Sequence, residues 1–391
     1  MTATQPTLVS IATRGPVARL LRALGIISRE ELQPVRAIAL LLLVTWVPLA
    51  VLTILRGTFV GDAVEITFIG SAAAQAKLLV ALPLLVLAEA GVAKGARFLI
   101  DTVRARSLLT DDAWDTLEAE VQRLRHWRDS AVVELAIAAL VILAVTYVAR
   151  SSIMLVELQR SSWLVDAAGR PSLAGWWYLR VSLFVLALAS LRWTWWILLW
   201  LRFLVVFLRP RLRVVPGHPD GVGGLSFLSK VQKSFALVFM SLAATVSGRL
   251  ANELLYEGAS LEATKIPVAV VLVLAALVMF GPMLLFAPQM AAARGREISA
   301  YDRLGQRLVD EFDAQWVPRE ADRNDLLGAP HASTLADFTS VYGALSKMRP
   351  IPVYLPYFVG AMVLVVLPFL PLLLTELSLA ELAQRMLKML L

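Results

Sequence analysis

The feature that most constrains this chain is a series of apolar runs, each about as long as a lipid bilayer is thick. A transmembrane helix needs about 20 consecutive, mainly apolar residues. Charged residues make up only 17% of the chain, against about 25% in an ordinary soluble protein. The sequence therefore predicts an all-α polytopic membrane protein. Six spans are clear, at 37–55, 74–93, 131–149, 179–207, 266–290 and 354–375.

A seventh span is weaker, at 234–255, because its second half carries small and polar residues. Cytoplasmic loops of membrane proteins have an excess of Lys and Arg. With seven spans, most of the 37 Lys and Arg residues fall on the side of the N-terminus, whereas without the weak span the basic segment 294–349 would move to the other side. We therefore expect seven spans, with the N-terminus inside and the C-terminus outside. Small residues at four-residue spacing, such as Ala243 and Ser247, predict that neighbouring helices pack closely on this span.

The segments between the spans predict helices that continue beyond the membrane. From Asp111 to Val148 no residue breaks the helical pattern, so span three should begin as one long cytoplasmic helix. Two amphipathic helices, around 301–316 and 334–348, must bury apolar stripes within or between subunits, which favours a homo-oligomer. The predicted parts are a basic amphipathic leader (1–36), spans one and two (37–93), a cytoplasmic helical extension (94–130), spans three to six (131–290) with a cytoplasmic loop (209–233), a cytoplasmic helical collar (291–352), span seven (353–376) and an amphipathic tail (377–391).

Charged residues within the spans are the first candidates for function, because their burial in a bilayer is costly. They can form ion pairs between helices, line a route for a solute, or do both. We expect Glu89 or Glu134 to pair with Arg202. The four-residue spacing of Arg192 and Trp196 is compatible with a cation–π contact, although we favour Trp196 as an apolar side chain that faces lipid or a neighbouring helix. The candidate intramembrane charges are Lys77, Glu89, Glu134, Arg192, Arg202, Arg249 and Glu253.

The loop between spans four and five contains the sequence PGHPDGVGG at 216–224. Its candidates are His218, Asp220, Gly223 and Gly224. A rigid turn that caps the next helix is the interpretation we favour, because one histidine and one aspartate make an incomplete metal-ligand set. A metal or catalytic site and a ligand contact remain alternatives. The chain has no cysteine, and we expect no metal and no cofactor.

Helix-breaking residues mark the last two spans. Gly281 and Pro282 interrupt span six, and Pro368 and Pro371 interrupt span seven. Such breaks are tolerated where neighbouring helices or water satisfy the freed backbone groups. They are typical of a pore-lining or moving helix, and equally of kinked packing.

Two motifs carry a resemblance. The segment HPDGVGGLSFL and the segment LLGAPHASTLADF from Leu326 resemble a family of uncharacterised multi-pass bacterial inner-membrane proteins with an HPDxxGGL loop, an LLGxxxxxxLADL-type segment and a proline-broken final span. Phe338 stands where the second motif has Leu. The resemblance implies a bacterial inner-membrane location and no particular activity. In architecture alone, the expected protein is also similar to insect odorant and gustatory receptor channels.

The expected function is a channel or transporter for ions or small solutes, and not an enzyme. The net charge of +7 would suggest nucleic acid in a soluble protein, but here the basic residues lie beside the spans, where they favour the bilayer as partner. We expect no nucleic-acid partner. The alternatives are a cytoplasmic-face membrane enzyme acting on a lipid or prenyl substrate, and a membrane scaffold or sensor that does not transport.

Overall fold

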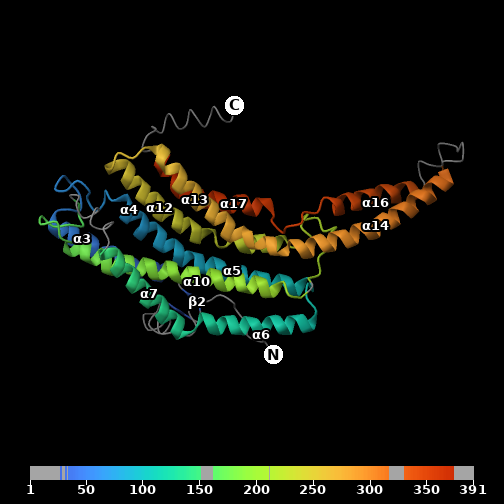
Figure 1. The fold of residues 1–391 in the computed structure, drawn as a ribbon, viewed down its shortest axis with the longest axis horizontal. Helices are drawn as coiled ribbons and strands as arrows, with labels where there is room; N and C mark the ends of the chain where they lie inside the picture. Colours follow the sequence, from blue (N-terminus) through green and yellow to red (C-terminus); the bar gives the residue numbers. More distant parts are fainter. Residues whose placement is uncertain are drawn as a thin grey trace.

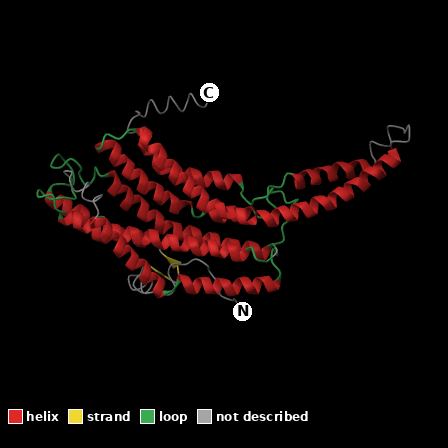
Figure 2. Ribbon diagram, viewed as in Figure 1, coloured by secondary structure: helices red, strands yellow, loops and turns green. Residues whose placement is uncertain are grey.

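The protein is all-α in the computed structural model, which describes residues 27–28, 31–32, 34–150, 162–210, 212–316 and 330–373. Two short strands, β1 (Ile27–Ser28) and β2 (Glu31–Leu32), pair antiparallel before the first helix. Nearly all of the predicted leader helix and the tail at 377–391 lie outside the described residues. Figure 2 shows that helices make up almost the whole of the described chain.

Six helical units in the described part of the chain are long and apolar enough to cross a membrane, and a bent pair would be the seventh. This confirms the expected polytopic fold. The six units are α2 (Pro34–Thr45) with α3 (Val47–Arg56); α4 (Ala72–Gln75), η1 (Ala76–Ala81) and α5 (Leu82–Ala105); α9 (Leu173–Trp177), η2 (Tyr178–Ser182) and α10 (Leu183–Phe207); α11 (Ser226–Lys233) and α12 (Ala236–Tyr256); α13 (Leu261–Phe280), η3 (Gly281–Phe286) and α14 (Ala287–Trp316); and α17 (Leu355–Val366), η4 (Leu367–Phe369) and α18 (Leu370–Leu373).

The spans lie side by side along the long axis of the molecule, and two helices extend beyond them (Figure 1). These are α14 and α16 (Pro330–Ser346), which pack against each other as a hairpin. We call this end of the bundle the hairpin end. Tyr301 of α14 stacks on Phe338 of α16 with ring centroids 5.8 Å apart, so the predicted amphipathic helices bury their stripes at least partly against each other.

The weak seventh span is α12, and its neighbours bury it. Ala243, Ala244 and Gly248 are buried. A Cβ atom built on Gly248 would clash with the side chain of Ala76 and lie 2.8 Å from the carbonyl oxygen of Ala72. The absence of a side chain at Gly248 therefore lets α12 approach the α4–η1 segment closely, as the small-residue spacing predicts.

The predicted unbroken helix from 110 to 148 is wrong. It is two helices, α6 (Asp111–Arg128) and α7 (Ala131–Arg150), bent by 44° at the break. Asp129 ends the first helix, and the carbonyl of Ser130 accepts the hydrogen bond of the Glu134 amide. Ser130 thus stands just before α7, at a position where serine is a preferred N-cap residue. The bend lays α6 along α10 (Figure 1).

Candidate functional site

Three spans bring opposite charges together beside the start of α7. Glu89 lies on α5, Glu134 on α7 and Arg192 on α10. Nη1 of Arg192 is 3.8 Å from Oε1 of Glu134, and both carboxylates act electrostatically on the guanidinium of Arg192. Glu89 is only 4% exposed. The guanidinium also lies 5.7 Å from the ring centroid of Trp196, which is the cation–π contact that their four-residue spacing allows.

The break between α6 and α7 adds two charges to this group. Arg128 forms a two-pronged contact with Asp129, with Nε 2.8 Å from Oδ1 and Nη2 3.0 Å from Oδ2. Both residues act electrostatically on Arg192. We use the name charge cluster for Glu89, Arg128, Asp129, Glu134 and Arg192. Its members come from three helical units, so a movement of one unit against another changes their spacing.

Arg202 is not part of the charge cluster, and its predicted pairing with Glu89 or Glu134 is wrong. Nη2 of Arg202 is 2.7 Å from Oε1 of Glu120 on α6. Arg192 and Arg202 are ten residues apart on one helix, which separates them by about 15 Å at 1.5 Å per residue. The carboxylates that reach Arg192 therefore cannot also reach Arg202, and α6 supplies the partner that the sequence did not indicate.

The remaining intramembrane charges lie at the end opposite the hairpin. Nζ of Lys77 is 3.4 Å from the hydroxyl oxygen of Tyr178. Lys77 belongs to the π-helical segment η1 and Tyr178 to the π-helical segment η2, so two local distortions meet at this contact. Arg249 and Glu253 form an i,i+4 pair at 2.7 Å on the exposed face of α12. No contact joins them to the charge cluster among the described residues, and Arg249 serves below as a control.

The loop at the hairpin end is organised by the carboxylate of Asp220. Oδ1 accepts hydrogen bonds from the amides of Val222 and Gly224, each at 3.0 Å, and Oδ2 accepts one from Ser226 at 3.1 Å. Ser226 is the first residue of α11, so Asp220 satisfies one of its otherwise unpaired amides. Burial raises the pKa of Asp220, but the hydrogen bonds outweigh it and hold the pKa below its ordinary value.

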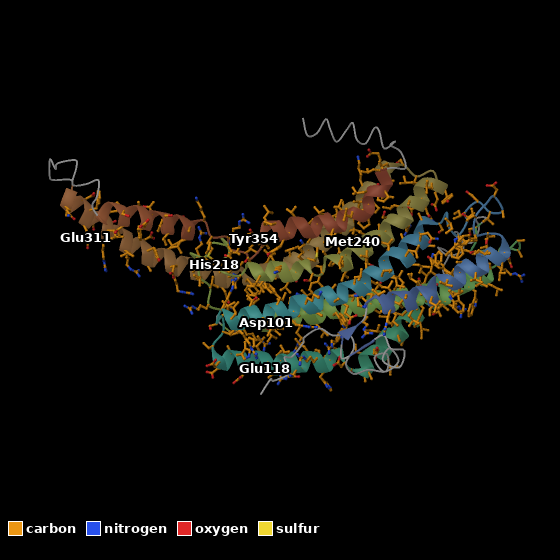
Figure 3. All side chains as sticks on the ribbon, turned by 180° about the vertical axis from the view of Figure 1, so that it is seen from behind. Asp101, Glu118, His218, Met240, Glu311 and Tyr354 are labelled. Atoms are coloured by element: carbon orange, nitrogen blue, oxygen red, sulfur yellow. The ribbon has the colours of Figure 1, made fainter. Side chains whose placement is uncertain are left out.

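His218, Gly223 and Gly224 belong to the same turn. Nδ1 of His218 lies 3.0 Å from Oδ1 of Asp220, and both glycines have positive φ, +67° and +84°. The described residues contain no group of three metal-ligating side chains. The loop also joins helix ends, because Arg106 of the α5 C-terminus donates to the carbonyl of Gly224 at 2.6 Å. Figure 3 shows His218 where the hairpin meets the bundle.

The helix-breaking residues lie in 3₁₀ segments or next to them. Gly281 and Pro282 begin η3, Pro368 lies in η4, and Pro371 lies in α18. In a 3₁₀ pattern, Pro371 would have to donate to the carbonyl of Pro368, but proline has no N–H group. The hydroxyl of Ser247 on α12 donates to that carbonyl instead, at 2.6 Å. This contact fixes the break in span seven against the buried helix.

Comparisons of the chain with protein-family models, with curated proteins and with solved structures find no match. The resemblance through HPDGVGGLSFL therefore stays an expectation based on two motifs. The observed helices support a membrane protein, and its activity has to be argued from the charges and contacts described above.

Proposed function

We propose that this protein moves ions or small charged solutes across the membrane, as a channel or transporter, and that the charge cluster lines the route. The supporting observation is the meeting of Glu89, Arg192 and Glu134 from three different spans. Charges on membrane spans are costly to bury, and they commonly mark ion or substrate pathways.

The contact between Arg192 and Glu134 has a geometry that suits exchange with a solute charge. The separation of 3.8 Å between Arg192 and Glu134 is at the long end for an ion pair, and their side chains are 28% and 25% exposed. The structural pair Arg202–Glu120 is much shorter, at 2.7 Å. A loose, partly accessible pair can be replaced by contacts to a passing ion at a lower cost in free energy than a tight one.

We also propose a bacterial inner-membrane location with the hairpin end in the cytoplasm, and assembly into a homo-oligomer. Basic residues gather at the hairpin end, as expected for the cytoplasmic side. The two sequence motifs support the inner-membrane assignment. The described basic residues at this end include Arg209, Arg213, Lys230, Arg294, Arg296, Lys347 and Arg349.

A second candidate function, a scaffold that recruits a partner, rests on the hairpin. The packing of α14 and α16 on each other leaves part of their apolar side chains uncovered in the described structure. Leu304 and Val309 of α14 and Val341 of α16 are exposed. These side chains would suit a partner protein or a second copy of the hairpin. Loss of a co-purifying partner from a Leu304→Glu/Val341→Glu variant, with transport unchanged, would favour this role.

The transport proposal is tested by flux into proteoliposomes that contain the purified full-length chain. Proton, potassium and chloride movement are followed with ion-sensitive dyes. We expect flux of at least one of these ions. In Glu134→Gln the rate of that flux should change about tenfold or more, which corresponds to about 1.4 kcal/mol. Arg249→Gln is the matched control, because it removes a span charge on the exposed face of α12. Equal rates in Glu134→Gln, Arg249→Gln and the wild type would contradict the assigned route.

A further inference from the structure

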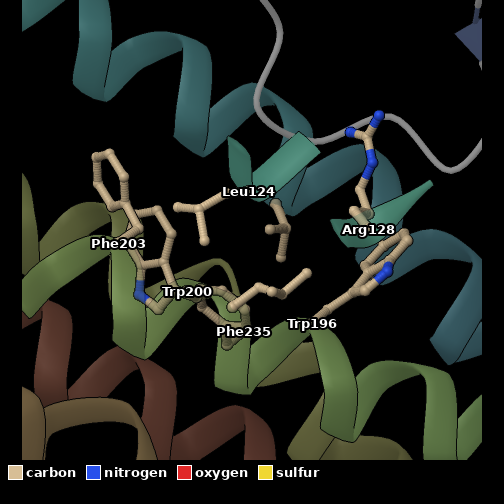
Figure 4. Close-up of a pocket in the computed structure, with 8 residues that line it drawn as sticks. Leu124, Arg128, Trp196, Trp200, Phe203 and Phe235 are labelled. Carbon is tan, nitrogen blue, oxygen red and sulfur yellow. The ribbon is translucent and has the colours of Figure 1, made fainter. Parts of the chain in front are cut away.

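An apolar cavity of about 50 Å³ lies between α6 and the spans α5 and α10. Trp196, Trp200, Phe203 and Phe235 form most of its wall, and Leu124 of α6 contributes from the other side (Figure 4). Arg128 stands at its edge, with the guanidinium directed away from the aromatic rings (Figure 4). The cavity thus has an apolar interior and a basic rim, and its size admits only a short part of a longer apolar molecule.

Arg125, three residues before Arg128 on α6, adds an independent observation beside the cavity. Its Nε and Nη2 atoms are buried and have no hydrogen-bond partner among the residues that the structure describes. Arg125 and Arg128 are three residues apart, so they lie on the same face of α6. The carboxylates of Asp129 and Glu118 act on the charge of Arg125 only at longer range, without a hydrogen bond to these two nitrogen atoms. Neighbouring arginines have acceptors: Arg128 contacts Asp129, and Arg123 contacts Glu120. Buried donors in proteins are normally satisfied, and an exception is a place where a bound anion can supply the missing acceptor.

We propose that an anionic phospholipid binds here, with its phosphate accepting hydrogen bonds from Arg125 and one acyl chain entering the cavity between α6 and α10. The charge is complementary, because a guanidinium matches a phosphate in shape and hydrogen-bonding capacity. The apolar aromatic wall matches an acyl chain. A phosphate ion alone would satisfy Arg125 but would leave the cavity without an occupant.

The position of the site in the fold supports a lipid as the occupant. The cavity lies next to the bend where the polar helix α6 gives way to the apolar helix α7. Such a change from polar to apolar surface is expected at the level of the lipid headgroups. A phospholipid at that level has its phosphate beside α6 and its chains beside the spans. The lipid would also hold α6 against α10, as the pair Glu120–Arg202 does further along the two helices.

The test compares thermal unfolding of the detergent-solubilised full-length protein in micelles doped with dioleoyl phosphatidylglycerol or dioleoyl phosphatidylcholine. We expect the anionic lipid to raise the Tm by several degrees more than the zwitterionic lipid. In Arg125→Gln the apparent affinity for the anionic lipid should fall about fivefold, as expected for one basic residue near an anionic surface. Arg123→Gln, on the exposed side of the same helix, is the control and should respond like the wild type.

Two further probes separate the headgroup from the chain. Dihexanoyl phosphatidylglycerol and inorganic phosphate carry the anion without a long chain, and we expect little or no increase in Tm from either. If they stabilise the protein as much as the dioleoyl lipid does, the site binds a free anion and the lipid assignment is overturned. It is equally overturned if the wild type does not distinguish the two dioleoyl lipids, or if Arg125→Gln keeps the full response. Leu199→Phe, which fills the cavity wall, should weaken only the effect of the long-chain lipid.

Discussion

Arg202 donates two hydrogen bonds to a single oxygen of Glu120, from Nε at 3.2 Å and from Nη2 at 2.7 Å. This contact joins α10 to α6, and Arg202 also lies 4.6 Å from the ring centroid of Trp127 on α6. Arg123 occupies the second oxygen of Glu120 at 3.3 Å. The carboxylate is nearly buried, whereas the side chain of Arg202 is 45% exposed. The pair is therefore a main attachment of the polar helix to the membrane bundle.

We predict that Glu120→Ala destabilises the protein by roughly 2 kcal/mol, less than the 3–5 kcal/mol of a fully buried pair because Arg202 keeps access to solvent. The measurement is chemical unfolding in detergent, combined with Arg202→Ala in a double-mutant cycle. Asp115→Ala on the exposed face of α6 is the control and should change little. Additive effects of Glu120→Ala and Arg202→Ala would mean that the observed contact contributes no coupling energy.

The spans could be predicted from the sequence because their signal is physical and local. Apolar runs give the clear helices, and the small residues of α12 together with the bias of Lys and Arg identify the weak one. The break at Asp129–Ser130 was missed, although serine before an apolar run is a usual helix start. A straight helix through 111–148 would not place α6 along α10, so the sequence did not indicate Glu120 as the partner of Arg202. Pairings between distant helices depend on packing angles that no periodicity encodes.

A second prediction concerns the close approach of α12 to the α4–η1 segment. Gly248→Ala should destabilise the protein by about 1–3 kcal/mol, the usual cost of overpacking, because its Cβ would meet backbone and side-chain atoms that cannot swing away. Gly295→Ala is the matched control, since nothing lies within 4 Å of the added Cβ. That change should be neutral or stabilising through helix propensity. The measurement compares the unfolding midpoints of Gly248→Ala and Gly295→Ala with that of the wild type. Equal midpoints for the two variants would argue against tight packing at Gly248.

The carboxylate of Asp220 should make stability depend on pH. Its pKa is lower in the folded protein than in the unfolded chain, so its contribution is complete above the ordinary carboxyl pKa and is lost as pH falls through the folded value. Asp220→Asn should therefore cost about 0.5–2 kcal/mol near neutral pH, as the loss of a helix cap does. The difference from the wild type should shrink in acid. Unfolding curves between neutral and acidic pH provide the measurement, and a difference independent of pH would contradict the assignment.

His218 and Gly223 separate a structural turn from a metal or catalytic site. We expect His218→Ala to fold normally, because the two polar contacts of its Nδ1 atom, with a carboxylate oxygen and the backbone amide of Asp220, both stay within the loop. Gly223→Val should impair folding, since φ is +67° and the Cβ would lie 2.5 Å from Cγ1 of Val214 and 2.9 Å from Cε of Met348. Expression and gel filtration compare the two variants. Stoichiometric metal in the purified protein, lost in His218→Ala, would show that the loop is a metal site.

The last prediction concerns the orientation of the bundle. Ala167 lies in an exposed loop at the end opposite the hairpin, and Lys347 is exposed where α16 ends. Because the chain has no native cysteine, Ala167→Cys and Lys347→Cys each introduce a single reactive thiol. If the hairpin end faces the cytoplasm, a membrane-impermeant maleimide should label Ala167→Cys in cells with a permeable outer membrane, and Lys347→Cys only after the inner membrane is opened. The reverse pattern would place the hairpin outside the cell. The basic hairpin end would then lie outside the cytoplasm, contrary to the usual excess of Lys and Arg in cytoplasmic segments.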